Sequence, residues 1–319
     1  MNMYFVKYAT KKFILFFIFF VLFLMISSIF LEIFVDLNKN YNFNNWLNFW
    51  KRFWTFNFGS FKSDEFKALN FSVASLYFYF FKNSFLVIFF VIIFALFFGV
   101  IAGSLFSFYA RKKSIQILNT LIYFLSSIPI FIIVALFVLI LSKFDLTSFY
   151  IPFDQEHFLL WFNSIIQIFF LLFFPMFFAI TFIVKNICDK LFFSEHFMFL
   201  LSKGFSIKKI YFYYFLKNIF IKLIPFINVF YMLTFSYSLF VESIFSFTGQ
   251  SMILTSAFNR GESSIIYFSL FINLIIIFII DLLLNILLKI LNPSNLNIKK
   301  TIGFLDKIKI KRTLIKRAN

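Results

Sequence analysis

Cysteine and histidine are almost absent from this chain of 319 residues, and their scarcity excludes several kinds of site. The single cysteine, Cys188, cannot form an intrachain disulfide or a cysteine metal cluster, and we interpret it as a free thiol without a role. The two histidines, His157 and His196, lie at opposite ends of a long apolar segment, so we expect that they do not share a site. No group of histidine, cysteine and acidic residues has metal-ligand spacing, so we expect no metal site.

Glycine is also rare, and its seven positions lack the spacing of two common catalytic motifs. No two glycines are five residues apart, which excludes the G-x-x-x-x-G-K-[ST] phosphate loop. The G-x-S-x-G nucleophile motif is absent as well. We therefore expect no enzyme activity and no cofactor in this chain.

Charged residues make up only 13% of the chain, whereas 62% of residues are hydrophobic. A soluble domain carries about twice that share of charge, and a disordered chain needs low hydrophobicity. The remaining class is an all-α membrane protein. The 62 phenylalanines are typical of AT-biased codon usage and by themselves indicate no function.

Six charge-poor apolar runs approach or exceed the roughly 20 residues that cross a bilayer as a helix. They predict six transmembrane helices at about 13–34, 83–110, 114–142, 157–184, 219–246 and 263–289. The first run ends in Leu31-Glu32 rather than at a small-residue cleavage site, so we interpret it as a retained helix and not a signal peptide.

The distribution of basic residues predicts the orientation. A net charge of +17 would also fit a nucleic-acid-binding protein, but the basic residues lie between apolar runs or after the last one. Placing both termini in the cytoplasm puts 22 of the 30 lysines and arginines inside, as the positive-inside rule requires. We expect a plasma-membrane protein with cytoplasmic termini and no nucleic-acid partner.

The spans divide the chain into three parts. Residues 1–82 hold the first helix and a long extracytoplasmic loop, residues 83–295 hold a five-helix core with a cytoplasmic loop at 185–218, and residues 296–319 form a basic cytoplasmic tail. The long loop carries Trp46, Trp50 and Trp54 at helical spacing. We favour a short helix at the membrane interface, and a docking surface for an extracellular partner is the alternative.

Several residues inside the spans are candidates for packing or for a pathway. Gly99 and Gly103, four apart, permit close helix approach, and Pro129 is expected to kink or break its span, as are Pro175 and Pro225. Asp281 and Asn285 are one turn apart in the last span. An ionisable residue there is a functional candidate, and a hydrogen bond between helices is the equally weighted alternative.

The cytoplasmic loop contains a short amphipathic pattern that ends at Gly204, a residue type typical of helix C-terminal caps. Its apolar face must be covered by the bilayer or by another protein. The stretch Glu195–Ile210 and the following Leu216-Lys217-Asn218 resemble the cytoplasmic loop of binding-protein-dependent ABC importer permeases of the oligopeptide/dipeptide/nickel branch. Ser202-Lys203-Gly204-Phe205 takes the place of its Ala-Lys-Gly-hydrophobic element, whereas Met198-Phe199-Leu200 replaces its Glu-Ala-Ala.

The resemblance extends over about residues 55–295. Val241-Glu242-Ser243-Ile244-Phe245 is similar to an outer Val-Glu segment of that branch, and Thr248-Gly249 stands where the branch has Pro-Gly. Ser126-Ser127-Ile128-Pro129 is similar to its Ser-x-Pro. One helix, a long loop and five further helices resemble the B-type oligopeptide permease subunit.

This resemblance implies a type I importer pathway subunit, most often for oligopeptides, with nickel or another small solute as the alternative. It implies a second homologous permease, two ATP-binding subunits that hold ATP and magnesium, and an extracytoplasmic substrate-binding lipoprotein. Glu195, Ser202, Lys203, Gly204 and Phe205 would couple this chain to the ATPase. A polytopic membrane enzyme or a scaffold is the alternative from another class.

Overall fold

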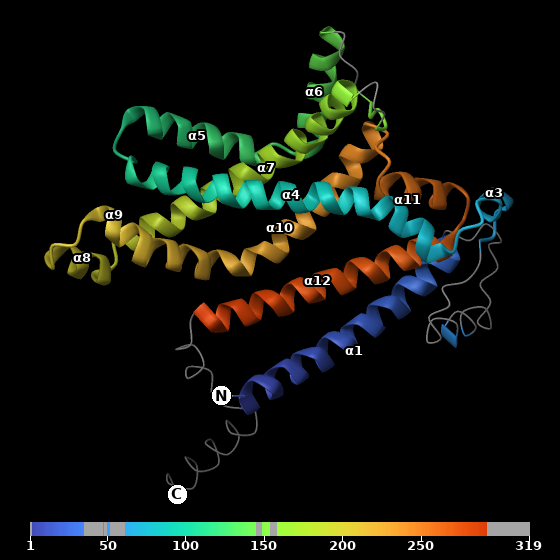
Figure 1. The fold of residues 1–319 in the computed structure, drawn as a ribbon, viewed down its shortest axis with the longest axis horizontal. Coiled ribbons are helices and arrows are strands. Elements are labelled where there is room, and N and C mark those ends of the chain that lie inside the picture. Colours follow the sequence, from blue (N-terminus) through green and yellow to red (C-terminus); the bar gives the residue numbers. More distant parts are fainter. Residues whose placement is uncertain are drawn as a thin grey trace, which may run out of the picture.

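The computed structural model describes residues 2–34, 47, 50–51, 61–144, 149–153 and 158–291, which are helices and short connections with no β-strand among them (Figure 1). In chain order the helices are α1 (Asn2–Phe34), α3 (Asp64–Ala68), α4 (Val73–Phe108), α5 (Lys113–Ser127), α6 (Ile130–Lys143), α7 (Phe158–Phe192), α8 (Glu195–Ser202), α9 (Ile207–Ile210), the π-helical turn η1 (Tyr211–Phe215), α10 (Leu216–Ile244), α11 (Gln250–Asn259) and α12 (Ser263–Leu291). The side chains of residues 2–12, 15 and 31–34 are outside this description. The all-α class is confirmed for the described residues.

Four helical stretches are long and apolar enough to cross a membrane: α4, α7, the run Ile207–Ile244 that ends in α10, and α12. The pair α5 and α6 meets the same criterion together, but the two helices are bent by 99°. In α1 the apolar helix found among the described residues is Phe16–Phe30, which is shorter than a full span. The described residues thus contain four or five candidate spans, and the sixth span and the cytoplasmic termini stay predictions.

Four of the predicted spans differ from the observed helices. α1 begins eleven residues earlier than predicted, at Asn2. α4 begins ten residues earlier than predicted, at Val73, because the Ser72 side chain caps it by accepting a hydrogen bond from the Ser75 N–H (3.2 Å). The third predicted span is broken after Ser127, where Pro129 precedes α6 and lacks an N–H for the helix. The fourth continues to Phe192, so residues 185–192 of the predicted loop are helical.

The helices form an elongated bundle (Figure 1). One end carries α8 and α9, and the opposite end carries α3 and α11. The start of α1 and the end of α12 lie toward the α8 end. Of the three predicted loop tryptophans, Trp46 and Trp54 lie outside the described residues, and Trp50 is buried in a cluster with Phe20 and Leu24 of α1.

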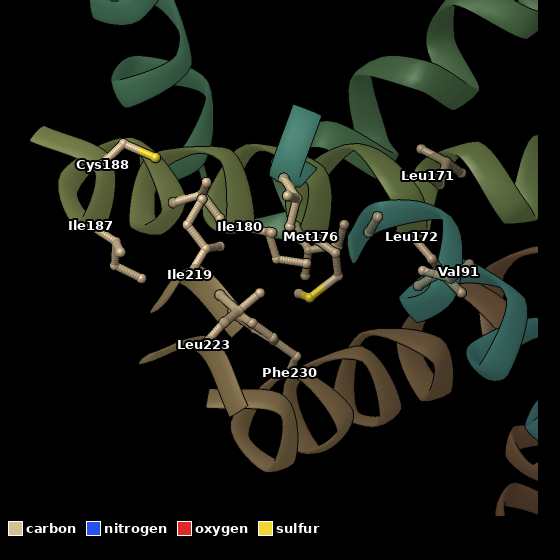
Figure 2. Packing of buried hydrophobic residues seen from close by; sticks show 14 of the residues in the cluster. Val91, Leu171, Leu172, Met176, Ile180, Ile187, Cys188, Ile219, Leu223 and Phe230 are labelled. Atoms are coloured by element: carbon tan, nitrogen blue, oxygen red, sulfur yellow. The ribbon is translucent and has the colours of Figure 1, made fainter. Parts of the chain in front are cut away.

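The closest packing in the bundle joins α4 to α7. A Cβ atom on Gly99 would lie 2.6 Å from Cγ2 of Ile180, and one on Gly103 would lie 2.6 Å from the carbonyl oxygen of Thr181. Both glycines are therefore needed for the approach of the two helices. Figure 2 shows the buried cluster in which side chains of α7, Ile180 and Met176 among them, meet Ile219 and other side chains of α10.

α1 packs on α12 through aromatic rings. The rings of Phe16 and Phe278 stack at 3.7 Å between centroids, and Phe20 lies 5.7 Å from Phe271. Several other phenylalanines of α1 are exposed, as expected of a helix surrounded by lipid. Part of the phenylalanine excess therefore has a packing role.

Candidate coupling site

α8 is a helix of eight residues whose two ends are both fixed by the chain itself. At its start, the Ser194 side chain accepts a hydrogen bond from the Phe197 N–H (3.3 Å). At its end, Gly204 has φ +79°, and the N–H groups of Gly204 and Phe205 donate to the carbonyls of Leu201 (2.9 Å) and Leu200 (3.2 Å). This pair of bonds is a Schellman motif, the helix end that the sequence predicts at Gly204.

The inner side of α8 is anchored by one aromatic side chain, Phe197, which is 7% exposed. Its ring meets Phe192 edge-on at 5.2 Å and Phe215 at 5.5 Å. Phe108 completes the group, 4.9 Å from Phe192 and 5.9 Å from Phe215. We call these four residues the aromatic junction. It joins α8 to the ends of α4 and α7 and to the π-helical turn that leads into α10.

The outer side of α8 and the turn after it expose a patch of apolar side chains. We call it the outer patch; its members are Met198, Phe199, Leu201, Phe205 and Ile207, each at least 37% exposed. Charged residues surround it: Glu195 lies in the first turn of α8, where its charge complements the helix dipole, and the Lys203 ammonium lies 4.4 Å from the Phe199 ring centroid. An apolar patch with a charged rim is typical of a protein interface.

The five residues predicted to couple therefore have different surroundings. Lys203 and Gly204 form the exposed end of α8, and Phe205 belongs to the outer patch. The Ser202 hydroxyl donates to the Phe199 carbonyl (2.9 Å), a bond within the helix. Glu195 is exposed at the opposite end of the helix.

The π-helical turn links α8 to α4 by hydrogen bonds. Tyr211 donates from its hydroxyl to Ser104 of α4 (3.1 Å), and the Tyr214 hydroxyl is hydrogen-bonded to Ser194, the N-cap of α8 (3.2 Å). Ser104 also lies within hydrogen-bonding distance of the buried Cys188 thiol (3.9 Å). π-helical turns are rare and frequently occur at functional sites.

A second polar contact fixes α4 to α7 at the same end of the bundle. Asp189 pairs with Lys185 one turn earlier in α7 (2.9 Å) and accepts a hydrogen bond from the Ser107 hydroxyl of α4. The Lys185 side chain is only 15% exposed. The aromatic junction thus sits against a rigid α4–α7 pair.

The remaining predicted residues lie away from this site. Glu242, near the end of α10, is 1% exposed, and its Oε2 accepts from the Ser251 N–H in α11 (3.0 Å). Asn285 donates to the side chain of Asp281 (3.0 Å) and to its backbone carbonyl, so the bonds between them lie within α12. Pro129 occupies the break between α5 and α6.

Sequence reasoning missed the aromatic junction and a buried carboxylate at the α11 end. In a chain with 62 phenylalanines, nothing distinguishes the four junction residues from their neighbours. Glu262, fully buried, accepts hydrogen bonds from the backbone N–H groups of Lys62 (2.7 Å) and Ser63 (2.5 Å). Its only sequence signal is an acidic residue directly before the last span.

Residues 95–296 match the family described as the binding-protein-dependent transport system inner membrane component. The match covers more than half of the chain and includes the end of α4, all of α8 and the whole of α12. No curated protein matches the chain. The chain therefore belongs to the family of binding-protein-dependent transport system inner membrane components and is the multi-pass membrane permease of an ABC transporter.

Proposed function

We propose that this chain forms half of the pathway of an ATP-driven importer for oligopeptides, and that α8 transmits the movement of a partner ATPase. The observation that carries the coupling role is the two-sided character of α8. Its inner side is held by Phe197 in the aromatic junction, and its outer patch is exposed. A helix with these two faces joins one protein surface to another.

The aromatic junction suits the transmission of movement because it is closely packed. Phe197 contacts rings from the end of α7 and from the π-helical turn, and both of these contact Phe108 of α4. Packed aromatic rings resist compression. A displacement of α8 would therefore be passed to three membrane-crossing segments together.

The outer patch matches what a groove of an ATPase subunit would cover. The apolar members lose water on docking, and Glu195 and Lys203 remain at the rim to set orientation. ATP binding in the partner would then favour one of two permease states through differential contacts at α8. The second permease, the two ATPase subunits and the binding lipoprotein belong to this proposal.

The substrate rests on the resemblance to the oligopeptide branch, with nickel as the alternative. Uptake of labelled di- to pentapeptides and of nickel, in cells with and without the gene, separates the two. Peptide uptake that depends on the gene supports the proposal. Gene-dependent uptake of nickel alone overturns the substrate and leaves the permease assignment intact.

Gly204 provides the test of coupling. A Cβ atom at this position would meet no other atom of the chain within 4 Å, although φ is +79°. We expect Gly204→Leu to lose most ATP-driven uptake in reconstituted vesicles while ATP hydrolysis continues. A leucine in this left-handed conformation would be strained by about 1–2 kcal/mol, and its side chain would lie at the docking surface.

Gly204→Asn is the matched control, since asparagine tolerates the left-handed conformation better than leucine. It should retain more uptake per ATP than the leucine variant at equal membrane insertion. If Gly204→Leu transports as well as the wild type, the coupling role of α8 is wrong.

A further inference from the structure

Beyond Lys113 and Ser114 in its first turn, α5 has a polar side that runs to its end. At 3.6 residues per turn, the polar residues from Gln116 onward fall within a sector of about 120°. They are Gln116, Asn119, Thr120, Tyr123, Ser126 and Ser127. Five apolar residues fill a separate sector of about the same width: Ile117, Leu118, Leu121, Phe124 and Leu125. The buried Ile122 lies between the two sectors, on the side that packs against α7.

The polar sector is largely exposed. Gln116, Thr120, Ser126 and Ser127 are all exposed, and Tyr123 is 43% exposed although its ring contacts Phe182 of α7. The next helix differs: every exposed residue of α6 before its terminal Ser142-Lys143 is apolar. The polar surface of α5 is thus not a general property of this region.

The two sectors suit different surroundings. An amide or hydroxyl moved from water into hydrocarbon without a partner costs about 4–8 kcal/mol, so Gln116 is disfavoured against lipid tails. Its Nε2 donates to the Ala110 carbonyl (3.2 Å), which leaves the exposed amide oxygen in need of a donor. The leucines of the other sector carry no such cost.

The sharp bend at the end of α5 also indicates that this side of the helix faces water and not lipid. The chain turns by 99° between Ser127 and Ile130, and the hydroxyls of Ser126 and Ser127 donate back to the carbonyls of Tyr123 (3.0 Å) and Phe124 (2.7 Å). Irregular backbone at membrane depth is tolerated where it is buried in protein or lines a water-filled cavity. Because both serines are exposed, the cavity is the setting that fits.

We infer that the polar side of α5 lines the water-filled path of the transporter, with Ser126 and Ser127 at the bend between α5 and α6. No charged residue follows Lys113 in this helix. A neutral lining of amides and hydroxyls can exchange hydrogen bonds with a polar solute such as a peptide. Because it forms no ion pair with the solute, the solute can leave as well as enter. This inference rests on the proposed function and adds the residues that contact the solute.

Thiol accessibility in the assembled transporter tests it. Thr120→Cys and Ser127→Cys place thiols on the polar side, and Leu121→Cys and Leu125→Cys place them on the apolar side at 49% and 36% exposure in the wild type. Open membrane fragments are treated with a charged methanethiosulfonate, which reacts with the thiolate and so requires water. The wild-type chain, whose only thiol is the fully buried Cys188, gives the background.

We expect both polar-side thiols to react at least tenfold faster than both apolar-side thiols. Equal rates on the two sides overturn the inference. Slow rates on the polar side overturn it as well, and disulfide formation between two permease chains at Thr120→Cys would then identify a protein interface instead. ATP-dependent uptake by the unlabelled variants is measured in parallel. Intact uptake together with unreactive thiols on the polar side refutes this inference alone. Absence of uptake by the wild-type transporter refutes the proposed function.

Discussion

Replacing Phe197 with alanine should uncouple the permease without unfolding it. Phe197 is the one buried side chain of α8, and its ring contacts Phe192 and Phe215 at centroid distances of 5.2 and 5.5 Å. The variant removes that ring and leaves the outer patch and both caps of α8 in place. It therefore separates the attachment of α8 to the membrane helices from the attachment of α8 to its partner.

The size of the effect follows from the burial. Truncation of a core phenylalanine to alanine costs about 3–5 kcal/mol. Phe197 is 7% exposed and lies at the edge of the bundle, so we take the lower value, about 3 kcal/mol. At about 1.4 kcal/mol for each factor of ten, the ratio of docked to undocked α8 falls about a hundredfold.

Two measurements on the reconstituted transporter check this. Uptake of the transported solute per ATP hydrolysed should fall at least tenfold, and amide hydrogen exchange over residues 195–203 should accelerate while exchange in α4 and α7 is unchanged. Phe193→Ala is the matched control, since that phenylalanine is four residues earlier and 87% exposed. The control should resemble the wild type in both measurements.

Wild-type uptake per ATP in Phe197→Ala would refute the reasoning, because α8 would then transmit movement without the aromatic junction. Faster exchange throughout α4 and α7 would also refute it, since the ring would then stabilise the whole bundle and not only α8. Loss of ATP hydrolysis in the variant would show that the junction shapes the docking surface itself.

Two further predictions concern stability, measured as the thermal unfolding midpoint in detergent. Gly103→Ala should cost about 1–3 kcal/mol and more than Gly99→Ala. Its Cβ would meet the Thr181 backbone oxygen, which cannot rotate away, whereas the Cβ of Gly99 would first meet the Cγ2 methyl of the Ile180 side chain. The reverse order would contradict the packing. Glu242→Ala should lower the free energy of unfolding by about 1–3 kcal/mol, because it leaves the Ser251 N–H unpaired. Glu242→Gln should lower it less, since the amide oxygen can still accept that hydrogen bond. Equal losses of stability in the two variants would contradict this.

The sequence predicted those parts of the molecule that depend on local chemistry. Apolar length located the membrane helices to within about ten residues, and the conformational freedom of glycine marked the end of α8 at Gly204. The break at Pro129 follows from the missing N–H of proline. Pro175 and Pro225, in contrast, lie inside continuous helices, because neighbouring helices and local adjustment can satisfy the freed carbonyls in a bundle.

Contacts between distant segments were not predictable. The aromatic junction joins residues 108, 192, 197 and 215, and Glu262 meets an N–H group 200 positions earlier in the chain. Neither contact leaves a periodic pattern, and the abundance of phenylalanine hides the first. The extension of α7 to Phe192 was missed because Lys185 ends the apolar run, although its ion pair with Asp189 is made along the helix.

The same structure explains why the family resemblance is eroded at some positions and kept at others. Phe199, which the sequence resemblance aligns with an alanine of the importer loop, is 52% exposed and lies 4.4 Å from the Lys203 ammonium, so the larger ring displaces nothing within the chain. Gly249 has no such freedom: a Cβ there would lie 2.5 Å from the Ser84 hydroxyl oxygen and 2.6 Å from the Glu242 carboxylate. A composition that favours phenylalanine can therefore replace exposed residues of α8. Such a replacement changes contacts with a partner protein, which can change in compensation, and leaves the fold intact. The same composition cannot replace Gly99, Gly103 or Gly249, because a side chain at these positions would clash inside the bundle. Gly204 is exposed and is kept for a different reason, its positive φ of +79°.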